Sequence, residues 1–517
     1  MKFFLIALMA ITLIFGTTEC QNQKETQTKY KAEWTSLQQH QTPQWLKDAK
    51  FGIYFHWGVY SYPGMGAWLS HYMYADKDDK QAWQRDTCLK LFGNDIQYID
   101  FIPKFTAKYF DADDWAKLFK ASGARFAGPV AEHCDNFSNW KSKVNKYNSY
   151  DMGPHRDIVG ELEKAIKGQG LKFITTFHHS WEWSWYRQYT GQIDTNVEGF
   201  EDFYGEYTKK GVFDNLKENM QSHISDAGVS YMTDSTLISS EKFAKQWLDK
   251  VNEVVDNYSP DLIYFDSRLY VLPEKIREEM AAHYYNHALE NDDQQVIITY
   301  KHKDMAEGSG VLDLEKGRMD DKTDFLWVTD DTWAHWAWAW NRKMKLKSTN
   351  EILQELVDIV SKNGCLLLNI SPTYDGKIPQ QMRNGLLNIG KWLKVNGEAI
   401  YNTKPFIVYG EGETKLKSNS WGGVQSLGVK YIPADYRFTQ NGDDIYIAQM
   451  VLPEPGEKCL VKSFASNGAA KGIKIKSLKL LGSDEKISWK QTALGIEFTS
   501  PTSFPNSRIL VYKAVVK

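Results

Sequence analysis

Residues 260–266, Pro-Asp-Leu-Ile-Tyr-Phe-Asp, form a short apolar run that ends in a carboxylate. Five further runs are mostly apolar on successive residues, at 51–55, 126–130, 173–177, 296–299 and 365–368. Strands covered on both faces of a parallel sheet have this composition, whereas half-exposed antiparallel strands alternate apolar and polar residues. The six runs therefore predict buried strands of a parallel sheet.

Helical patterns separate these runs. Asp113 and Asp114 precede Trp115, Leu118 and Phe119, which recur at the spacing of one helix face. Apolar residues repeat at the helical period over residues 158–166, and residues 348–351 have a capping-box sequence ahead of a third helix. The alternation of strands and helices predicts an α/β fold, most economically a closed (β/α)8 (TIM-like) barrel, over residues 44–400.

The C-terminal segment, residues 405–517, has a different pattern. Apolar and polar residues alternate in short stretches near residues 444–448, 495–498 and 509–512, and turn sequences such as Asn441-Gly442-Asp443 separate the stretches. We expect a small antiparallel β-sandwich, joined to the barrel through residues 397–404.

The N-terminus has the features of a targeting segment. Lys2 precedes an apolar run that ends at Phe15, and Cys20 follows shortly after. This arrangement predicts a signal peptide over residues 1–20 and export to the periplasm, the outer membrane or the medium. Cys20 resembles the lipidated cysteine of bacterial lipoproteins, so the sequence is compatible with a lipid-anchored form and with a free secreted form. Residues 21–43 are expected to be a flexible lead-in, and no later apolar run is long enough for a transmembrane segment.

Composition and spacing exclude several classes of function. The net charge of −3 gives no concentrated basic face, so a nucleic-acid partner is not expected. The four cysteines after Cys20 show no CxxC spacing, which excludes a zinc ribbon and a disulfide framework. No glycine-rich phosphate loop and no GxSxG sequence is present, which removes support for nucleotide chemistry and serine hydrolysis.

Chemically capable residues gather directly after the predicted strands. They are His56 and Trp57, Glu132 to Asp135, His178 and His179, Asp266, Lys301 to Lys303, and Asn369. The C-terminal ends of barrel strands form the active face of such folds, so these side chains are expected to meet at one rim. Of the tryptophans at 181–185 and 333–340, we expect one or two to line a pocket and the others to pack in the core.

Two carboxylates are candidates for glycoside cleavage. Asp266 stands at the tip of a buried strand, and Glu315 lies further along in an irregular stretch. A pair roughly 5–5.5 Å apart cleaves with retention, whereas a pair roughly 6.5–9.5 Å apart inverts. A capping role for Asp266 and a solvated position for Glu315 are the alternatives, and Glu132 and Glu182 compete for the acid/base role.

A metal site is a weaker interpretation of the histidines. His56, His133, His178 and His179 could bind zinc, but the first strand lacks the His-x-His pair that barrel zinc hydrolases use. Neutral imidazoles that donate hydrogen bonds to sugar hydroxyls are the better use, and neither a metal nor another cofactor is expected.

Several stretches resemble the α-L-fucosidases of glycoside hydrolase family 29. Residues 45–58 resemble the opening strand of that family, and residues 131–143 with 151–157 resemble its third block. Residues 259–266 resemble the nucleophile strand, residues 367–376 the last strand, and residues 392–401 the domain junction. The resemblance runs in order from about residue 44 to residue 405.

The resemblance implies a retaining, metal-free mechanism with Asp266 as nucleophile and Glu315 as general acid/base. It implies sugar contacts from His56, His133 and Trp68, and from His178 or His179. The full set of substrate-binding candidates also includes Trp57, Cys134, Lys301 and Trp327.

Three departures from the family pattern bear on specificity. Ala67 stands before Trp68 where the family commonly has Glu, and Cys134 follows His133 where it commonly has a second His, with Asn136 at a usual Gly. Lys301 or Lys303 stands where an Arg is frequent, and a lysine cannot form the same bidentate fork.

The sequence thus predicts a secreted hydrolase of bacterial type that releases α-L-fucose, or a related L-sugar, from fucosylated oligosaccharides or polysaccharides. A carbohydrate-binding protein on a degenerate barrel and a metal hydrolase are the alternatives. Release of aryl alcohol from an aryl α-L-fucoside separates the first two, and inactivation by chelators identifies the third.

Overall fold

The computed structural model describes residues 29–213, 237–291, 294–418, 424–425 and 428–516. The predicted signal peptide and Cys20 lie outside the described residues. None of the described helices combines the length and apolar character needed to cross a membrane.

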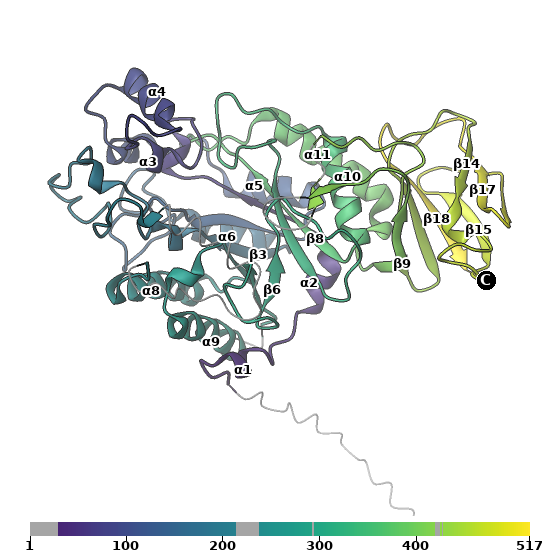
Figure 1. Ribbon diagram of the computed structural model, residues 1–517, viewed down its shortest axis with the longest axis horizontal. Coiled ribbons are helices and arrows are strands. Elements are labelled where there is room, and N and C mark those ends of the chain that lie inside the picture. The colour runs from purple at the N-terminus through teal and green to yellow at the C-terminus, as the bar shows by residue number, and fades with distance from the viewer. Residues whose placement is uncertain (1–28, 214–236, 292–293, 419–423, 426–427, 517) are drawn as a thin grey trace, which may run out of the picture.

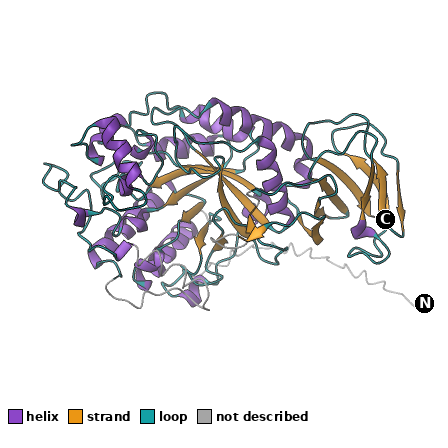
Figure 2. Cartoon of the chain, turned by 45° about the horizontal axis from the view of Figure 1, so that its top comes forward, coloured by secondary structure: helices purple, strands orange, loops and turns teal. Residues whose placement is uncertain are grey.

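Eight parallel strands close into a barrel, as predicted (Figure 1; Figure 2). Each strand pairs with the next along the chain, and β1 pairs with β8. The strands are β1 (Phe51–Phe55), β2 (Phe126–Glu132), β3 (Lys172–Phe177), β4 (Leu262–Phe265), β5 (Ile297–Lys301), β6 (Val311–Asp313), β7 (Trp327–Thr332) and β8 (Gly364–Ile370). The sequence patterns identified six of them, and missed β6 because it is short and β7 because polar residues interrupt it.

Helices surround the barrel in the three places where the patterns predict them and in others (Figure 2). Asp111 caps α5, Asp157 caps α6, and Ser348 forms the expected capping box with Glu351 at α10. The described helices are α1 (Trp34–Leu37), α2 (Gln44–Ala49), α3 (Leu69–Tyr72), α4 (Ala82–Phe92), α5 (Ala112–Ala121), α6 (Ile158–Gly168), α8 (Glu241–Tyr258), α9 (Glu274–Glu290), α10 (Thr349–Ser361) and α11 (Gln380–Asn396).

The barrel wall separates two apolar cores. Tyr54, Val130, Ile174, Tyr264 and Leu367 belong to a core inside the barrel. Residues one position away along the same strands belong to a larger core between the barrel and its helices. Because successive side chains of a strand point to opposite faces, the position of a residue in its strand decides which core it enters.

The C-terminal strands form antiparallel sheets at one end of the molecule, beyond α10 and α11 (Figure 1). One sheet has the order β15-β18-β13-β12-β9 and the other the order β14-β17-β16, with a separate apolar core between them. Their bounds are β9 (Lys404–Glu411), β12 (Tyr436–Asn441), β13 (Asp444–Gln449), β14 (Lys458–Val461), β15 (Ile475–Leu480), β16 (Trp489–Thr492), β17 (Gly495–Thr499) and β18 (Leu510–Val516), and β10 (Lys417–Ser418) pairs with β11 (Val424–Gln425).

The described part of the predicted lead-in is docked on α9. Tyr30 and Asn286 exchange two hydrogen bonds of 2.7 and 2.9 Å. The Trp34 indole donates to Glu274 at 2.6 Å, and the His40 ring stacks on Tyr285 with centroids 3.7 Å apart. From Tyr30 onward the segment is therefore part of the folded structure, because its aromatic residues find partners on that helix.

Candidate active site

A cavity of about 300 Å³ opens at the C-terminal ends of the barrel strands. Most of the predicted site residues line it, from several strands. They are His56, Trp68, His133, Cys134, His178, Asp266, Lys301 and Glu315. The structure adds residues that the sequence reasoning did not select, namely Tyr72, Gln81, Gln84, Tyr264, Ser267 and Asp330. Trp181 and Trp338 are the members of the two tryptophan sets that reach the cavity.

Asp266 directly follows β4, and its backbone continues the strand pairing. Its N–H donates to the Phe177 carbonyl of β3 at 3.1 Å. The side chain is 17% exposed, and Oδ1 lies 3.2 Å from Lys301 Nζ. The ion pair with Lys301 therefore holds the Asp266 carboxylate at the mouth of the barrel. This position favours a role in the cavity over the alternative of capping a helix.

Glu315 follows β6, and pairing with β7 fixes it in place. The N–H of Leu314 donates to Val328 and that of Lys316 to Asp330, at 2.9 and 2.8 Å. Glu315 Oε2 lies 3.1 Å from Lys301 Nζ. Burial raises the pKa of Glu315, and the Lys301 ammonium opposes that rise. A carboxyl group that keeps its proton more readily than usual is suited to act as a general acid.

Lys301 is the last residue of β5 and connects the two candidate catalytic groups. Its side chain is only 2% exposed, and Nζ lies within 3.2 Å of Asp266, Glu315 and Asp330. Burial disfavours the ammonium, but the surrounding carboxylates outweigh this effect and hold the pKa of Lys301 well above its ordinary value. The site therefore contains a permanent buried cation.

Three imidazoles form one wall of the cavity. The rings of His56, His133 and His178 have centroids 4.8–5.4 Å apart. Burial lowers the pKa of His56 to about 4 and the pKa values of His133 and His178 well below the ordinary value. At neutral pH the three rings are uncharged, so each can donate one hydrogen bond and accept another.

The histidine wall keeps hydrogen-bonding capacity for a ligand. Nδ1 of His56 lies 2.8 Å from Asn369 Oδ1, which fixes that ring. Within the described part of the chain, Nδ1 of His133 and Nδ1 of His178 have no hydrogen-bond partner. Buried polar atoms without a partner are costly unless a ligand or water satisfies them.

Cys134 lies beside this wall as an uncharged thiol. Its Sγ is 3.5 Å from the His178 carbonyl, and burial raises its pKa well above the ordinary value. The four cysteines of the described residues are all unpaired and buried.

Aromatic rings form another part of the cavity lining. Trp68 stacks on Tyr72 with centroids 5.7 Å apart and meets Trp181 edge-on at 5.5 Å. Trp338 lies 5.5 Å from His56, whereas Trp336 is 56% exposed and does not line the cavity. Flat aromatic surfaces of this kind pack against the C–H faces of sugars.

Three predicted substrate contacts lie elsewhere in the structure. Trp57 packs among Phe105, Phe110 and Trp115. His179 stacks on the Trp247 ring of α8. Trp327 is fully buried, and its indole N–H donates to the Lys362 carbonyl at 3.0 Å.

The strand period explains these three positions. Tyr54 and His56 point into the barrel, so Trp57 points out, and the same rule sends His178 in and His179 out. In β7 the inward positions are Val328 and Asp330, which leaves Trp327 on the outer side. For β1 and β3 the pattern was readable in the sequence, whereas in β7 it points to Asp330 only once the strand is known.

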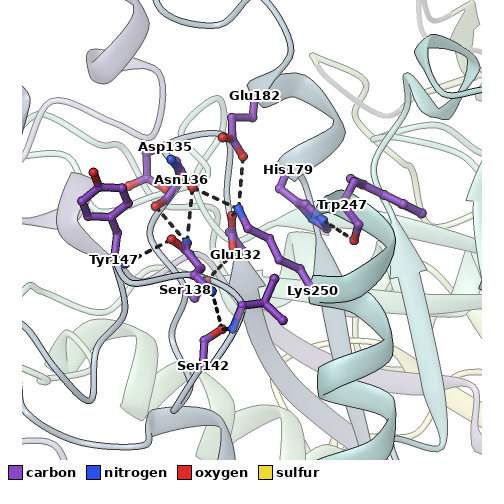
Figure 3. Close-up of polar contacts among 12 residues, drawn as sticks. Glu132, Asp135, Asn136, Ser138, Ser142, Tyr147, His179, Glu182, Trp247 and Lys250 are labelled. Atoms are coloured by element: carbon purple, nitrogen blue, oxygen red, sulfur yellow. Dashed lines mark hydrogen bonds and ion pairs between the residues drawn. The ribbon is translucent and has the colours of Figure 1, made fainter. Parts of the chain in front are cut away.

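The two competing glutamates belong to a separate buried cluster (Figure 3). Lys250 of α8 binds Glu132 at 2.5 Å and Glu182 at 3.4 Å, and its Nζ also donates to the Asn136 side chain at 3.0 Å. Burial raises the pKa of Glu182 to about 7. Neither glutamate lines the catalytic cavity, and the cluster fixes the loop that carries His133 and Cys134.

No group of three or more His, Cys, Asp and Glu side chains in the described ranges is arranged to hold a metal ion. The histidine wall instead offers uncharged hydrogen-bonding groups.

Comparisons with known proteins agree with this geometry. The sequence profile described as Alpha-L-fucosidase matches residues 17–398. Human tissue alpha-L-fucosidase is 30% identical over 459 residues, which cover 87% of this chain and 84% of the human protein. An alpha-L-fucosidase of Branchiostoma floridae is 26% identical and covers 93% of both chains.

A solved structure shows the same architecture. The alpha-fucosidase of Thermotoga maritima in complex with fucose aligns with a TM-score of 0.69 at 25% identity, covering 94% of this chain and 100% of that chain. With the family profile over most of the chain, a closed barrel and a carboxylate pair at its rim, the chain belongs to the alpha-L-fucosidase family, glycoside hydrolase family 29.

Proposed function

We propose that the chain is a retaining exo-glycosidase that releases L-fucose from the non-reducing ends of fucosylated oligosaccharides or polysaccharides. The observation that carries this proposal is the position of Asp266 and Glu315, which come from different strands and contact one buried ammonium at the C-terminal rim. Their nearest oxygens can be no further apart than the sum of two distances of 3.2 and 3.1 Å. This bound applies to single oxygens, so retention is proposed from the family and is tested by the configuration of the released sugar.

In this proposal Asp266 attacks the anomeric carbon while Glu315 protonates the departing glycosidic oxygen. A covalent glycosyl-aspartate forms, and the aglycone leaves with the proton of Glu315. Glu315, now a carboxylate, takes a proton from water, and the resulting hydroxide displaces Asp266 to give L-fucose of retained configuration. His56, His133 and His178 bind the sugar hydroxyls, and Trp68 covers one face of the ring.

Of the departures at Ala67 and Cys134, Cys134 lines the cavity together with the carboxylate pair and Ala67 does not line it. A binding protein on a degenerate barrel would have no need for a glutamate whose pKa is raised beside a second carboxylate. Hydrolysis is therefore the function that this site supports best. The Cys134 thiol is a weaker hydrogen-bonding group than imidazole, so a related L-sugar such as L-galactose is the second substrate to examine.

We further propose that the protein is an exported enzyme of bacterial type. The support is the charged and apolar N-terminal sequence, and Cys20 makes a lipid anchor the specific form of export to test. Labelling of expressing cells with a lipid precursor, for the wild type and for Cys20→Ala, distinguishes anchored from free protein.

The deciding experiment compares 4-nitrophenyl α-L-fucoside with the α-L-galactoside. We expect release of nitrophenol from the fucoside, unaffected by chelators, and NMR of the first product should show the α anomer. Thermal stabilisation by fucose without release of nitrophenol would establish the binding protein instead, and loss of activity with a chelator would establish a metal hydrolase.

A further inference from the structure

Below the catalytic pair lies a second pair of carboxyl groups that the proposed reaction does not use. Asp330 of β7 and Asp313 of β6 are 1% exposed. Both point to the inside of the barrel, on the same side of their strands as Val328 and Val311. They lie between the apolar interior and the cavity, directly under Lys301.

Lys301 has one ammonium for four carboxyl groups. Nζ lies 3.2 Å from Asp266, 3.1 Å from Glu315 and 3.2 Å from Asp330, but 3.9 Å from Asp313. The contact with Glu315 is a hydrogen bond, and Asp266 and Asp330 contact the ammonium as ion pairs at nearly the same distance. The fourth, Asp313, is beyond hydrogen-bond distance from Nζ, and neither of its carboxyl oxygens has a hydrogen-bond partner among the described residues. Burial and the neighbouring Asp330 raise the pKa of Asp313 well above its ordinary value, which favours its neutral form.

Asp330 is itself anchored from the far side of the barrel. Its Oδ2 accepts a hydrogen bond from the Tyr54 hydroxyl of β1 at 2.8 Å and from Tyr264 of β4 at 3.3 Å. Its other oxygen, Oδ1, faces Lys301. The Asp330 carboxylate of β7 is therefore held by side chains of β1 and β4, independently of its contact with Lys301.

We infer that Asp330 is a positioning residue for the proposed glycosidase reaction: together with Asp313 it holds Lys301 from below, so that the ammonium bridges Asp266 and Glu315. Lysine suits this role because its compact ammonium can serve three separate acceptors, whereas the planar guanidinium of an arginine favours one bidentate partner. The inference rests on the proposed function.

The bridge has a measurable effect on Glu315. The negative charge of Asp330 raises the pKa of Glu315, and the positive charge of Lys301 lowers it. The other titratable groups around this cluster are Tyr54, His56, His178, Tyr264, His302 and Lys316. The alkaline limb of the pH profile of kcat/KM follows the pKa of the general acid. Substitution of Asp330 and substitution of Lys301 should therefore move this limb in opposite directions.

The test compares Asp330→Asn with Asp331→Asn on 4-nitrophenyl α-L-fucoside across pH. Asp331 is the next residue of β7, points out of the barrel and pairs with Lys347 at 2.8 Å, so it controls for loss of a buried charge in the same strand. For Asp330→Asn we expect kcat to fall at least tenfold and the alkaline limb to move to lower pH by roughly 0.5 unit or more. Lys301→Met should move that limb to higher pH, and Asp331→Asn should move neither kcat nor the limb.

Equal pH profiles and equal kcat values for Asp330→Asn and Asp331→Asn would overturn the inference while leaving the proposed function intact. A wild type that releases no nitrophenol would overturn the proposed function itself, and the inference with it. If Asp330→Asn does not fold, Tyr54→Phe removes one anchor of Asp330, with Tyr285→Phe as a control for loss of a buried hydroxyl. We then expect kcat at least threefold lower for Tyr54→Phe, and equal values would overturn the inference.

Discussion

Asp266 and Glu315 contact the same ammonium group, yet the proposed reaction needs them in opposite protonation states. Desolvation raises the pKa of Glu315, and further carboxylates beside it also favour its neutral form. The two side chains are similarly exposed, 17% for Asp266 and 20% for Glu315, so exposure does not distinguish their roles. The raised pKa of Glu315 supports its role as the acid, and the place of Asp266 at the tip of β4 supports its role as the nucleophile.

Replacement of Asp266 by Ala should abolish turnover, by roughly 10³-fold or more, because the covalent route is lost. The matched control is Asp261→Ala. Asp261 lies at the opposite end of β4 and pairs with Lys172 at 2.8 Å, so its loss should lower the melting temperature and leave kcat unchanged. A few per cent of wild-type activity in Asp266→Ala, with a native melting curve, would contradict the assignment.

Replacement of Glu315 by Ala should separate the two chemical steps. A nitrophenolate leaves without a proton, so the first step with an activated aryl fucoside should be slowed much less than cleavage of a natural glycan. Azide should restore the second step and give a fucosyl azide of retained configuration. The same substitution at Glu182, which binds Lys250 outside the cavity, should show no azide product, and a rescued Glu182→Ala would move the role there.

At the scale of elements, the alternation of inward and outward residues decides which side chains reach the substrate. His178 and His179 are neighbours at the end of β3, but one lines the cavity and the other stacks on Trp247 of α8. Each histidine therefore serves as the control for the other.

For His178→Asn we expect kcat/KM for the fucoside to fall about 5- to 150-fold, since a lost buried hydrogen bond costs about 1–3 kcal/mol. For His179→Asn we expect a lower melting temperature, because the stacking on Trp247 is lost, and an unchanged kcat/KM. Steady-state kinetics and thermal melts on both variants check this pair. A lower kcat/KM in both variants would show that the alternation of inward and outward residues does not separate the roles of the two histidines.

The barrel could be predicted from the sequence because covered strands and capped helices leave strong local patterns. Val311–Asp313 leaves none, since three residues are too few for a period, and the polar residues of Trp327–Thr332 hide a strand. Asp330 was missed for this reason, although the inward period of β7 identifies it once the strand is known. The charge contacts of Lys301 could not be predicted, because they join residues of four strands that only the closed barrel brings together.

At the scale of the whole molecule, one buried carboxylate joins the barrel to the C-terminal sheets. Asp358 of α10 is fully buried and binds Arg437 of β12 at 2.5 Å, Lys362 at 3.1 Å and Arg318 at 3.3 Å. Burial disfavours its ionised form, but the three cations outweigh burial and hold the pKa of Asp358 below its ordinary value.

Replacement of Asp358 by Asn should lower the free energy of unfolding by about 3–5 kcal/mol, because three buried cations each lose a charge partner, although Arg318 keeps Glu355 at 3.5 Å. Since the folded pKa is depressed, this contribution is present above the unfolded value of about 3.9 and is lost as pH falls below it. The difference from wild type should therefore shrink in acid. Chemical denaturation at pH 7 and near pH 3 measures both effects.

The matched control for this junction is Glu398→Gln. Glu398 also joins the two parts, through Lys513 at 2.8 Å, but its side chain is 43% exposed. An exposed pair contributes at most about 1 kcal/mol, so this variant should be nearly as stable as wild type. Equal losses for the two variants would show that the buried position of Asp358 has no special importance.

The docking of Tyr30, Trp34 and His40 on α9 limits how far the chain can be shortened for practical work. A truncation at residue 44, where the barrel begins, would expose the Tyr285 ring and leave Asn286 and Glu274 without the partners described above. The uncovered aromatic surface would favour aggregation during purification. A shortened form that begins at residue 29 keeps the contacts of Tyr30, Trp34 and His40 with α9. It is therefore the better starting point for crystallisation or for attachment to a solid support.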